Sequence, residues 1–198
     1  MNSRYTEESI MGTLILYIGP MYSSKSTSLL REIERREAIG YSSVLLSHSF
    51  DTRYGEGVVS THSAKKRDCI SVDNLCSLIT PEFNDTLFRA RVVGIDESQF
   101  FGEADLYRFV KEMITYGKTI VVAGLDADAN QQPFRGVLNL IPLCDKVKKL
   151  RALCSMCEDG RKAPFTIKIS GDIDERIDIG GVDKYKAVCR KCLGKFKR

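Results

Sequence analysis

Apolar runs alternate with charged, helix-period segments through the first two thirds of the chain. The runs consist almost wholly of apolar, β-prone residues and lie at 13–18, 43–47, 92–96 and 119–125. From Lys25 to about Ile39, apolar residues recur at helical spacing among charged ones, and Gly40 ends the pattern. A second helical pattern runs from Ala104 to Tyr116. The pattern therefore predicts strands and helices in alternation.

The strand-like runs lack the polar alternation of a strand with one face in water. We therefore expect both faces of the sheet to be covered by helices. A helix between successive strands implies right-handed crossovers and parallel pairing. The predicted architecture is a three-layer α/β sandwich with a mostly parallel sheet.

The pattern of long apolar runs and helical segments ends after Lys149. Short β-prone pieces at 165–169 and 185–188 lie between two Cys-x-x-Cys pairs, which indicates an appendage built on hairpins. We therefore expect two domains, a nucleotide-binding α/β domain over residues 1–149 and a small metal-binding domain over 150–198. The segment 51–67, rich in glycine, serine and charge, is predicted to be a loop near the functional site.

Composition narrows the class of protein. The chain has 198 residues, 43% of them hydrophobic and 28% charged, enough for one main core. It contains no apolar run of the ~20 residues that a membrane span needs, and its start lacks a secretory segment, so we expect a cytoplasmic protein with no membrane partner. The net charge is +4, with a basic cluster at 190–198. Such a tail could contact nucleic acid but is more often a solvated end, and nucleic acid is not expected as a partner.

The segment Gly19–Ser26 matches the Walker A pattern, except that Ser24 stands at the second glycine position. It follows a strand and opens a helix, which would place backbone N–H groups on phosphates, Lys25 on the β/γ oxygens and the Ser26 hydroxyl on Mg²⁺. The alternative is an ordinary serine-rich turn, because serine also caps helices. If the backbone at Ser24 needs a positive φ, serine there costs on the order of 1 kcal/mol.

A second motif supports the phosphate-loop interpretation. The apolar run that starts at Val92 ends in Asp96 and Glu97, as a Walker B strand does. Asp96 would hold hydrated Mg²⁺, and Glu97 would face the other reactant. The alternative is that Asp96 and Glu97 are two ordinary acidic residues exposed to solvent at the end of a strand. Together the motifs predict a P-loop (RecA-like) fold with ATP and Mg²⁺ as cofactors.

Seven cysteines in a chain without an export signal are expected to be reduced, so paired spacings point to metal. Two knuckles of two thiolates make a closed, tetrahedral structural zinc site, whereas four free buried cysteines are the alternative. The predicted Zn²⁺ ligands are Cys154, Cys157, Cys189 and Cys192. The other three, Cys69, Cys76 and Cys144, are expected to be core thiols.

The motifs, taken in order, resemble those of type II thymidine kinases, the cytosolic and viral/bacterial form. The resemblance covers the chain from Gly12 to Cys192. It rests on Gly19–Thr27, Asp51–Tyr54, Thr61–His62, Ile95–Phe101, Pro133–Phe134, the cysteine pairs and Gly180–Tyr185. It implies ATP-dependent phosphorylation of the 5′-hydroxyl of thymidine in nucleoside salvage, with deoxyuridine as a second candidate substrate.

The resemblance also implies roles for individual residues. Glu97 would be the base that takes the 5′-hydroxyl proton. The nucleotide would be bound by Gly19, Pro20, Met21, Tyr22, Ser23, Ser24, Lys25, Ser26, Thr27, Arg53 and Asp96. The nucleoside would lie among Met21, Phe100, Leu125, Phe134, Thr166 and Tyr185, with the backbone of Asp178 and Ile179 on the base edge. For Arg53, a solvated arginine on a capped turn is the alternative.

The family pattern further implies a lasso loop between the zinc knuckles, a homotetramer and feedback inhibition by thymidine triphosphate. The chain departs from this pattern at Ser24 and at Ala129, where many members carry an aromatic residue. Two other functions stay open on the sequence: a DNA-stimulated P-loop ATPase with a zinc ribbon, and a nucleotide-binding relative with little activity.

Overall fold

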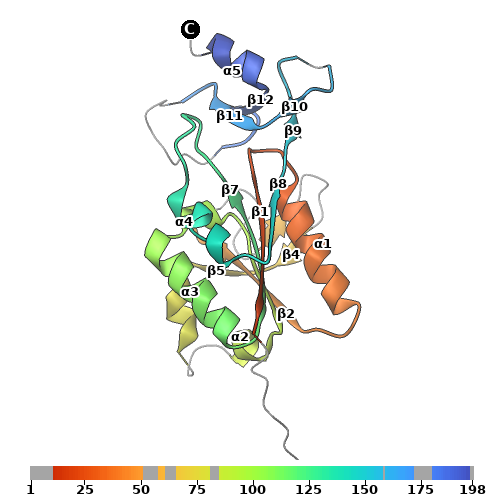
Figure 1. Ribbon diagram of the computed structural model, residues 1–198, viewed down its shortest axis with the longest axis vertical. Helices are drawn as coiled ribbons and strands as arrows, with labels where there is room; N and C mark the ends of the chain where they lie inside the picture. Colours follow the sequence, from red (N-terminus) through yellow and green to blue (C-terminus); the bar gives the residue numbers. More distant parts are fainter. Residues whose placement is uncertain are drawn as a thin grey trace, which may run out of the picture.

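The computed structural model describes residues 11–50, 58–60, 66–80, 85–157, 159–171 and 180–196. Its centre is a six-stranded sheet with the order β5-β2-β6-β7-β1-β8 (Figure 1). The strands are β1 (Thr13–Gly19), β2 (Ser43–His48), β5 (Ile70–Val72), β6 (Val92–Ile95), β7 (Thr119–Leu125) and β8 (Lys146–Lys149). Every neighbouring pair is parallel, which confirms the predicted sheet.

Helices cover both faces of the sheet (Figure 1). On β1, Leu14 and Leu16 pack in the core beneath α3, whereas Ile15 and Tyr17 pack in the core beneath α1. Because successive strand residues point to opposite faces, one apolar strand serves both cores. The helices and 3₁₀ turns are α1 (Lys25–Glu37), η1 (Leu75–Ile79), α2 (Asp85–Arg89), η2 (Ser98–Phe100), α3 (Glu103–Thr115), α4 (Arg135–Leu138), η3 (Ile141–Leu143) and α5 (Arg190–Phe196).

The prediction of a loop over 51–67 is wrong for the part of the segment that forms strands. The strands β3 (Val58–Ser60) and β4 (Lys66–Asp68) pair in antiparallel fashion. Val59 is buried and joins the core beneath α1. The two β-branched residues Val58 and Val59 therefore favour a strand here, although the neighbouring residues are rich in glycine and charge. Residues 51–57 and 61–65 lie outside the described part of the chain.

The C-terminal part forms a third, smaller core beyond the end of the sheet (Figure 1). It contains the antiparallel pairs β9 (Ala152–Leu153) with β10 (Lys162–Ala163) and β11 (Phe165–Lys168) with β12 (Tyr185–Val188), followed by α5. Ile167 and Val188 pack there against Cys154, Cys189 and Cys192. Within the described residues, no helix has the length and apolarity that a membrane crossing needs.

A buried lysine closes the short helix α2. The Lys118 ammonium group donates to three carbonyl oxygens at the end of that helix, of Leu87 (3.0 Å), Phe88 (2.8 Å) and Ala90 (2.7 Å). Burial lowers the pKa of Lys118, while the three acceptors favour the charged form. The side chain thus satisfies carbonyl groups that the helix itself leaves unpaired.

Lys118→Met is expected to lower the free energy of unfolding by about 1–3 kcal/mol, because buried carbonyls lose their donor. Urea denaturation measures the change. Lys111→Met, on the exposed face of α3, is the matched control and should leave the midpoint almost unchanged. Equal stability of both variants would contradict the capping role.

Candidate active site

The carboxyl ends of three neighbouring strands meet at one edge of the sheet. In the parallel register, Gly19 of β1 pairs with Leu125 of β7, and Ile95 of β6 pairs with Val122 of β7. The loops that follow these strands therefore emerge side by side. Ligands of open α/β sheets bind at this edge, and the residues predicted from both nucleotide motifs lie there.

Two side chains of the phosphate loop donate hydrogen bonds to a backbone carbonyl group of the same loop. The hydroxyl of Ser23 and the ammonium group of Lys25 both donate to the Pro20 carbonyl oxygen, each at 2.8 Å. Gly19 has a φ of 152°, and a Cβ built there would lie 2.6 Å from the Leu150 carbonyl oxygen. Glycine is therefore required at the first position of the motif.

Ser24 adopts the left-handed conformation, with φ 63° and ψ 36°, immediately before α1. The backbone at Ser24 therefore has the positive φ at which serine is strained. This conformation favours the glycine that the Walker A pattern carries at this position. The Ser24 side chain makes no capping hydrogen bond, so it does not offset the strain. Tyr22, two residues earlier, also has a positive φ of 62°.

The two nucleotide motifs meet through one hydrogen bond. The Ser26 hydroxyl donates to Asp96 Oδ1 at 3.1 Å, and the Glu97 backbone N–H donates to the same oxygen at 3.0 Å. Burial, together with the negative charge of Glu97, raises the pKa of Asp96 to about 7. A hydroxyl and a buried carboxylate fit Mg²⁺, which binds few protein oxygens and keeps much of its water.

Glu97 is half-buried and adopts a left-handed conformation, with φ 47° and ψ 41°. Its carboxylate accepts a hydrogen bond of 2.5 Å from the Gln99 side-chain amide, whose oxygen accepts from the Leu125 backbone N–H at 2.9 Å. Gln99 thus holds Glu97 against the end of β7. Gln99 is not among the predicted site residues, although it stands inside the motif that follows β6.

Two of the residues predicted to contact the nucleoside, Met21 and Thr166, come together from distant parts of the chain. The Met21 backbone N–H donates to Thr166 Oγ1 at 3.0 Å, which joins the phosphate loop to β11. Thr166, Phe134 and Tyr185 are buried, whereas Phe100 and Leu125 are half-buried. The rings of Phe100 and Phe50 make an edge contact, with centroids 5.6 Å apart.

Three predicted site residues, Arg53, Asp178 and Ile179, lie outside the described part of the chain, as do Asp51 and His62. Thr27 is exposed in the first turn of α1. The described site therefore consists of the phosphate loop, the end of β6, the loop after β7 and the strand β11.

The four paired cysteines converge. Their sulfur atoms all lie within 4.8 Å of one another, and Cys157 Sγ lies 3.3 Å from Cys192 Sγ and 3.7 Å from Cys189 Sγ. A tetrahedral zinc with Zn–S bonds of about 2.3 Å needs sulfur separations of about 3.8 Å. The backbone N–H of Cys189 also donates to Cys154 Sγ at 3.3 Å. The cluster is compatible with zinc.

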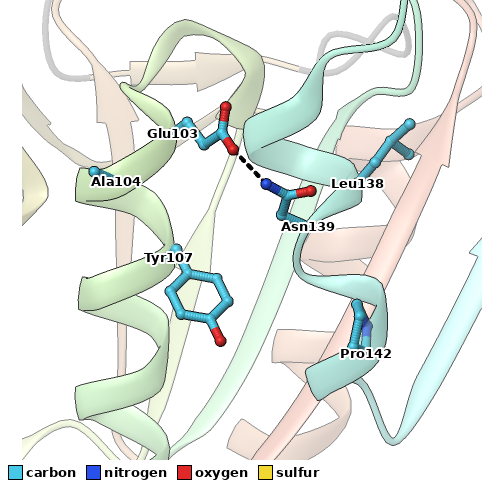
Figure 2. Close-up of a pocket in the computed structure, with 6 residues that line it drawn as sticks. All are labelled: Glu103, Ala104, Tyr107, Leu138, Asn139 and Pro142. Carbon is cyan, nitrogen blue, oxygen red and sulfur yellow. Dashed lines mark hydrogen bonds between the residues drawn. The ribbon is translucent and has the colours of Figure 1, made fainter.

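A groove of about 620 Å³ lies away from these residues, between α3 and the segment α4–η3 (Figure 2). Its lining consists of Glu103, Ala104, Tyr107, Leu138, Asn139 and Pro142, and contains none of the predicted site residues. Figure 2 shows Glu103 hydrogen-bonded to Asn139 across the groove. A carboxylate with no cation in the lining does not suit a triphosphate.

Comparison with known proteins identifies the family to which the chain belongs. The family model described as thymidine kinase matches residues 12–193. The chain belongs to the thymidine kinase family. It is 38% identical to the thymidine kinase of vaccinia virus (strain Ankara) and 39% identical to that of monkeypox virus. Each similarity extends over 181 residues, 91% of this chain and 96% of the viral protein.

Membership in the thymidine kinase family confirms the resemblance to type II enzymes that the motifs predict. Variola virus thymidine kinase is equally similar, at 38% identity over the same length. The match runs from before β1 to α5, so it includes the phosphate loop and both cysteine pairs.

Ser24→Gly is expected to stabilise the protein relative to Ser24→Ala by about 1 kcal/mol, because alanine keeps the Cβ atom that makes this conformation costly. Chemical denaturation of the two variants measures the difference. Both lack the serine hydroxyl, so the comparison isolates backbone strain. A glycine variant no more stable than the alanine variant would show that Ser24 is unstrained.

Proposed function

We propose that this thymidine kinase family member transfers the terminal phosphoryl group of ATP·Mg²⁺ to the 5′-hydroxyl of thymidine. One observation supports the assignment most directly: the Ser26–Asp96 hydrogen bond brings the phosphate loop beside Glu97. The 38% identity to a thymidine kinase over 91% of the chain supports thymidine as the acceptor. Deoxyuridine is the second acceptor that we propose.

In this mechanism the loop Gly19–Thr27 cradles the triphosphate with its backbone N–H groups, and Lys25 leaves the Pro20 carbonyl for the β/γ oxygens. Ser26 and Asp96 would hold Mg²⁺, which would neutralise phosphate charge. Glu97 accepts the proton of the 5′-hydroxyl as the new O–P bond forms and the bond to the ADP oxygen breaks. Gln99 fixes the Glu97 carboxylate for this step.

Residues of both parts of the chain form the proposed nucleoside pocket. Phe100, Leu125 and Phe134 come from the proposed nucleotide-binding domain, residues 1–149. Thr166, Tyr185 and the backbone of Asp178 and Ile179 come from the proposed zinc-binding lasso domain, residues 150–198. Apolar walls with a few polar groups suit a flat pyrimidine. From the family resemblance we also propose Arg53 near the donor phosphates, a homotetramer, and inhibition by thymidine triphosphate.

Glu97→Gln is expected to lower kcat for thymidine phosphorylation by about 10²–10⁴-fold, the contribution of a positioned general base. The KM for ATP should change little, because the phosphate loop is untouched. Transfer of labelled phosphate from ATP to thymidine measures the effect. Glu103→Gln, in the groove between α3 and α4, is the control and should retain parental kcat. Full activity of Glu97→Gln would exclude it as the base.

The cysteine cluster is proposed to hold one structural Zn²⁺. Metal analysis of the purified protein should give about one zinc per chain, and Cys154→Ser should lose it and unfold the C-terminal part. Zinc binding contributes on the order of 10 kcal/mol to small zinc-dependent folds. Cys144→Ser, outside the cluster, should keep both metal and stability. A parent protein without stoichiometric metal would rule out the site.

A further inference from the structure

Gln131 stands in an unusual backbone conformation in the loop between β7 and α4. Its φ is 60°, in the left-handed region that glutamine rarely adopts. Asp128 holds the turn in place, since its Oδ1 accepts from the backbone N–H groups of Asn130 (2.9 Å) and Gln132 (2.8 Å). The Gln131 N–H itself donates to the Asp128 carbonyl oxygen at 3.0 Å. The fold thus fixes Gln131 at the cost of local strain.

The orientation of the Gln131 side-chain amide follows from its neighbours. Nε2 donates to the carbonyl oxygens of Ala129 (2.5 Å) and Thr166 (3.3 Å). Both partners can only accept, so the reverse orientation would set Oε1 against two oxygens. The position of Oε1 is therefore determined by the fold.

This fixed oxygen is buried and has no hydrogen-bond partner in the part of the chain that the structure describes. A buried polar atom without a partner is unfavourable and rare in native proteins, where it often marks a site completed by something else. Strain and an unsatisfied acceptor coincide at one residue. The Nε2 bonds serve the packing of the loop, but Oε1 does not, so the unsatisfied acceptor points to a ligand donor.

Gln131 contacts one residue predicted to bind the nucleoside and lies in the loop between two others. Leu125 and Phe134 flank its loop, and its amide contacts Thr166, whose hydroxyl accepts from the Met21 backbone in the phosphate loop. We propose that Gln131 Oε1 accepts a hydrogen bond from a donor group of the bound nucleoside and helps determine specificity. The inference rests on the proposed nucleoside kinase function. Thymidine offers two such donors, the imide N–H of the base and the 3′-hydroxyl.

Gln131→Met tests the proposal, because methionine keeps the length and removes the acceptor. It also removes the Nε2 donor, so a comparison of substrates is needed to isolate the acceptor. Its kcat/KM for thymidine should fall about 3- to 10-fold, the range for one neutral hydrogen bond, with the KM for ATP unchanged. The parent and the variant are compared on thymidine, 3′-deoxythymidine and N3-methylthymidine. For the analogue that lacks the relevant donor, the difference between parent and variant should vanish.

Gln132→Met is the matched control, since the neighbouring glutamine is exposed, and it should behave as the parent on every substrate. A loss in Gln131→Met that is equal for all three nucleosides indicates a structural role and overturns the proposal. So does an unchanged kcat/KM.

Calorimetric binding of the same nucleosides separates this inference from the proposed activity. A parent that binds thymidine without phosphorylating it contradicts the activity, while the affinities of Gln131→Met still support or overturn the acceptor role. A parent that neither binds nor phosphorylates thymidine contradicts both.

Discussion

The hydrogen bond from Ser26 to Asp96 is the contact on which the candidate site depends. It connects the loop after β1 with the end of β6, two strands that are separated in the sheet by β7. The contact is possible because all three strands run parallel and end at one edge. It also places the Asp96 carboxylate against the phosphate loop, where burial and, second, the charge of Glu97 raise the pKa of Asp96. A Mg²⁺ ion held by Ser26 and Asp96 would relieve that cost.

Backbone strain concentrates around this contact. The non-glycine residues with positive φ in the described ranges are Tyr22, Ser24, Glu97 and Gln131, and all four lie in loops at the carboxyl edge of the sheet. Two of them are held by hydrogen bonds of their surroundings: the Gln99 amide fixes the Glu97 carboxylate, and the Asp128 turn fixes Gln131. Strain of this kind persists only where neighbouring contacts determine the backbone, which is typical of sites built for a ligand.

The C-terminal part of the chain contacts the phosphate loop directly. Tyr22 of the phosphate loop packs against the core that contains the cysteine cluster, and Met21 hydrogen-bonds Thr166 of β11. The position of β11 thus affects the loop that would bind the triphosphate. A metal at the cysteines would order β11 and β12 and, through Thr166, the wall of the proposed nucleoside pocket.

The sequence by itself determined the four central strands β1, β2, β6 and β7, the helices α1 and α3, the phosphate loop, the acidic end of β6 and the cysteine pairs, but not the edge strands β5 and β8. These features are local, since they depend on the period of apolar residues and on short spacings. Only the tertiary structure decided the partners of Gln99, Gln131 and Thr166, and the hairpin of β3 and β4. Such contacts join residues far apart in the chain, through strand register and the packing of one core on another, and no local pattern encodes them.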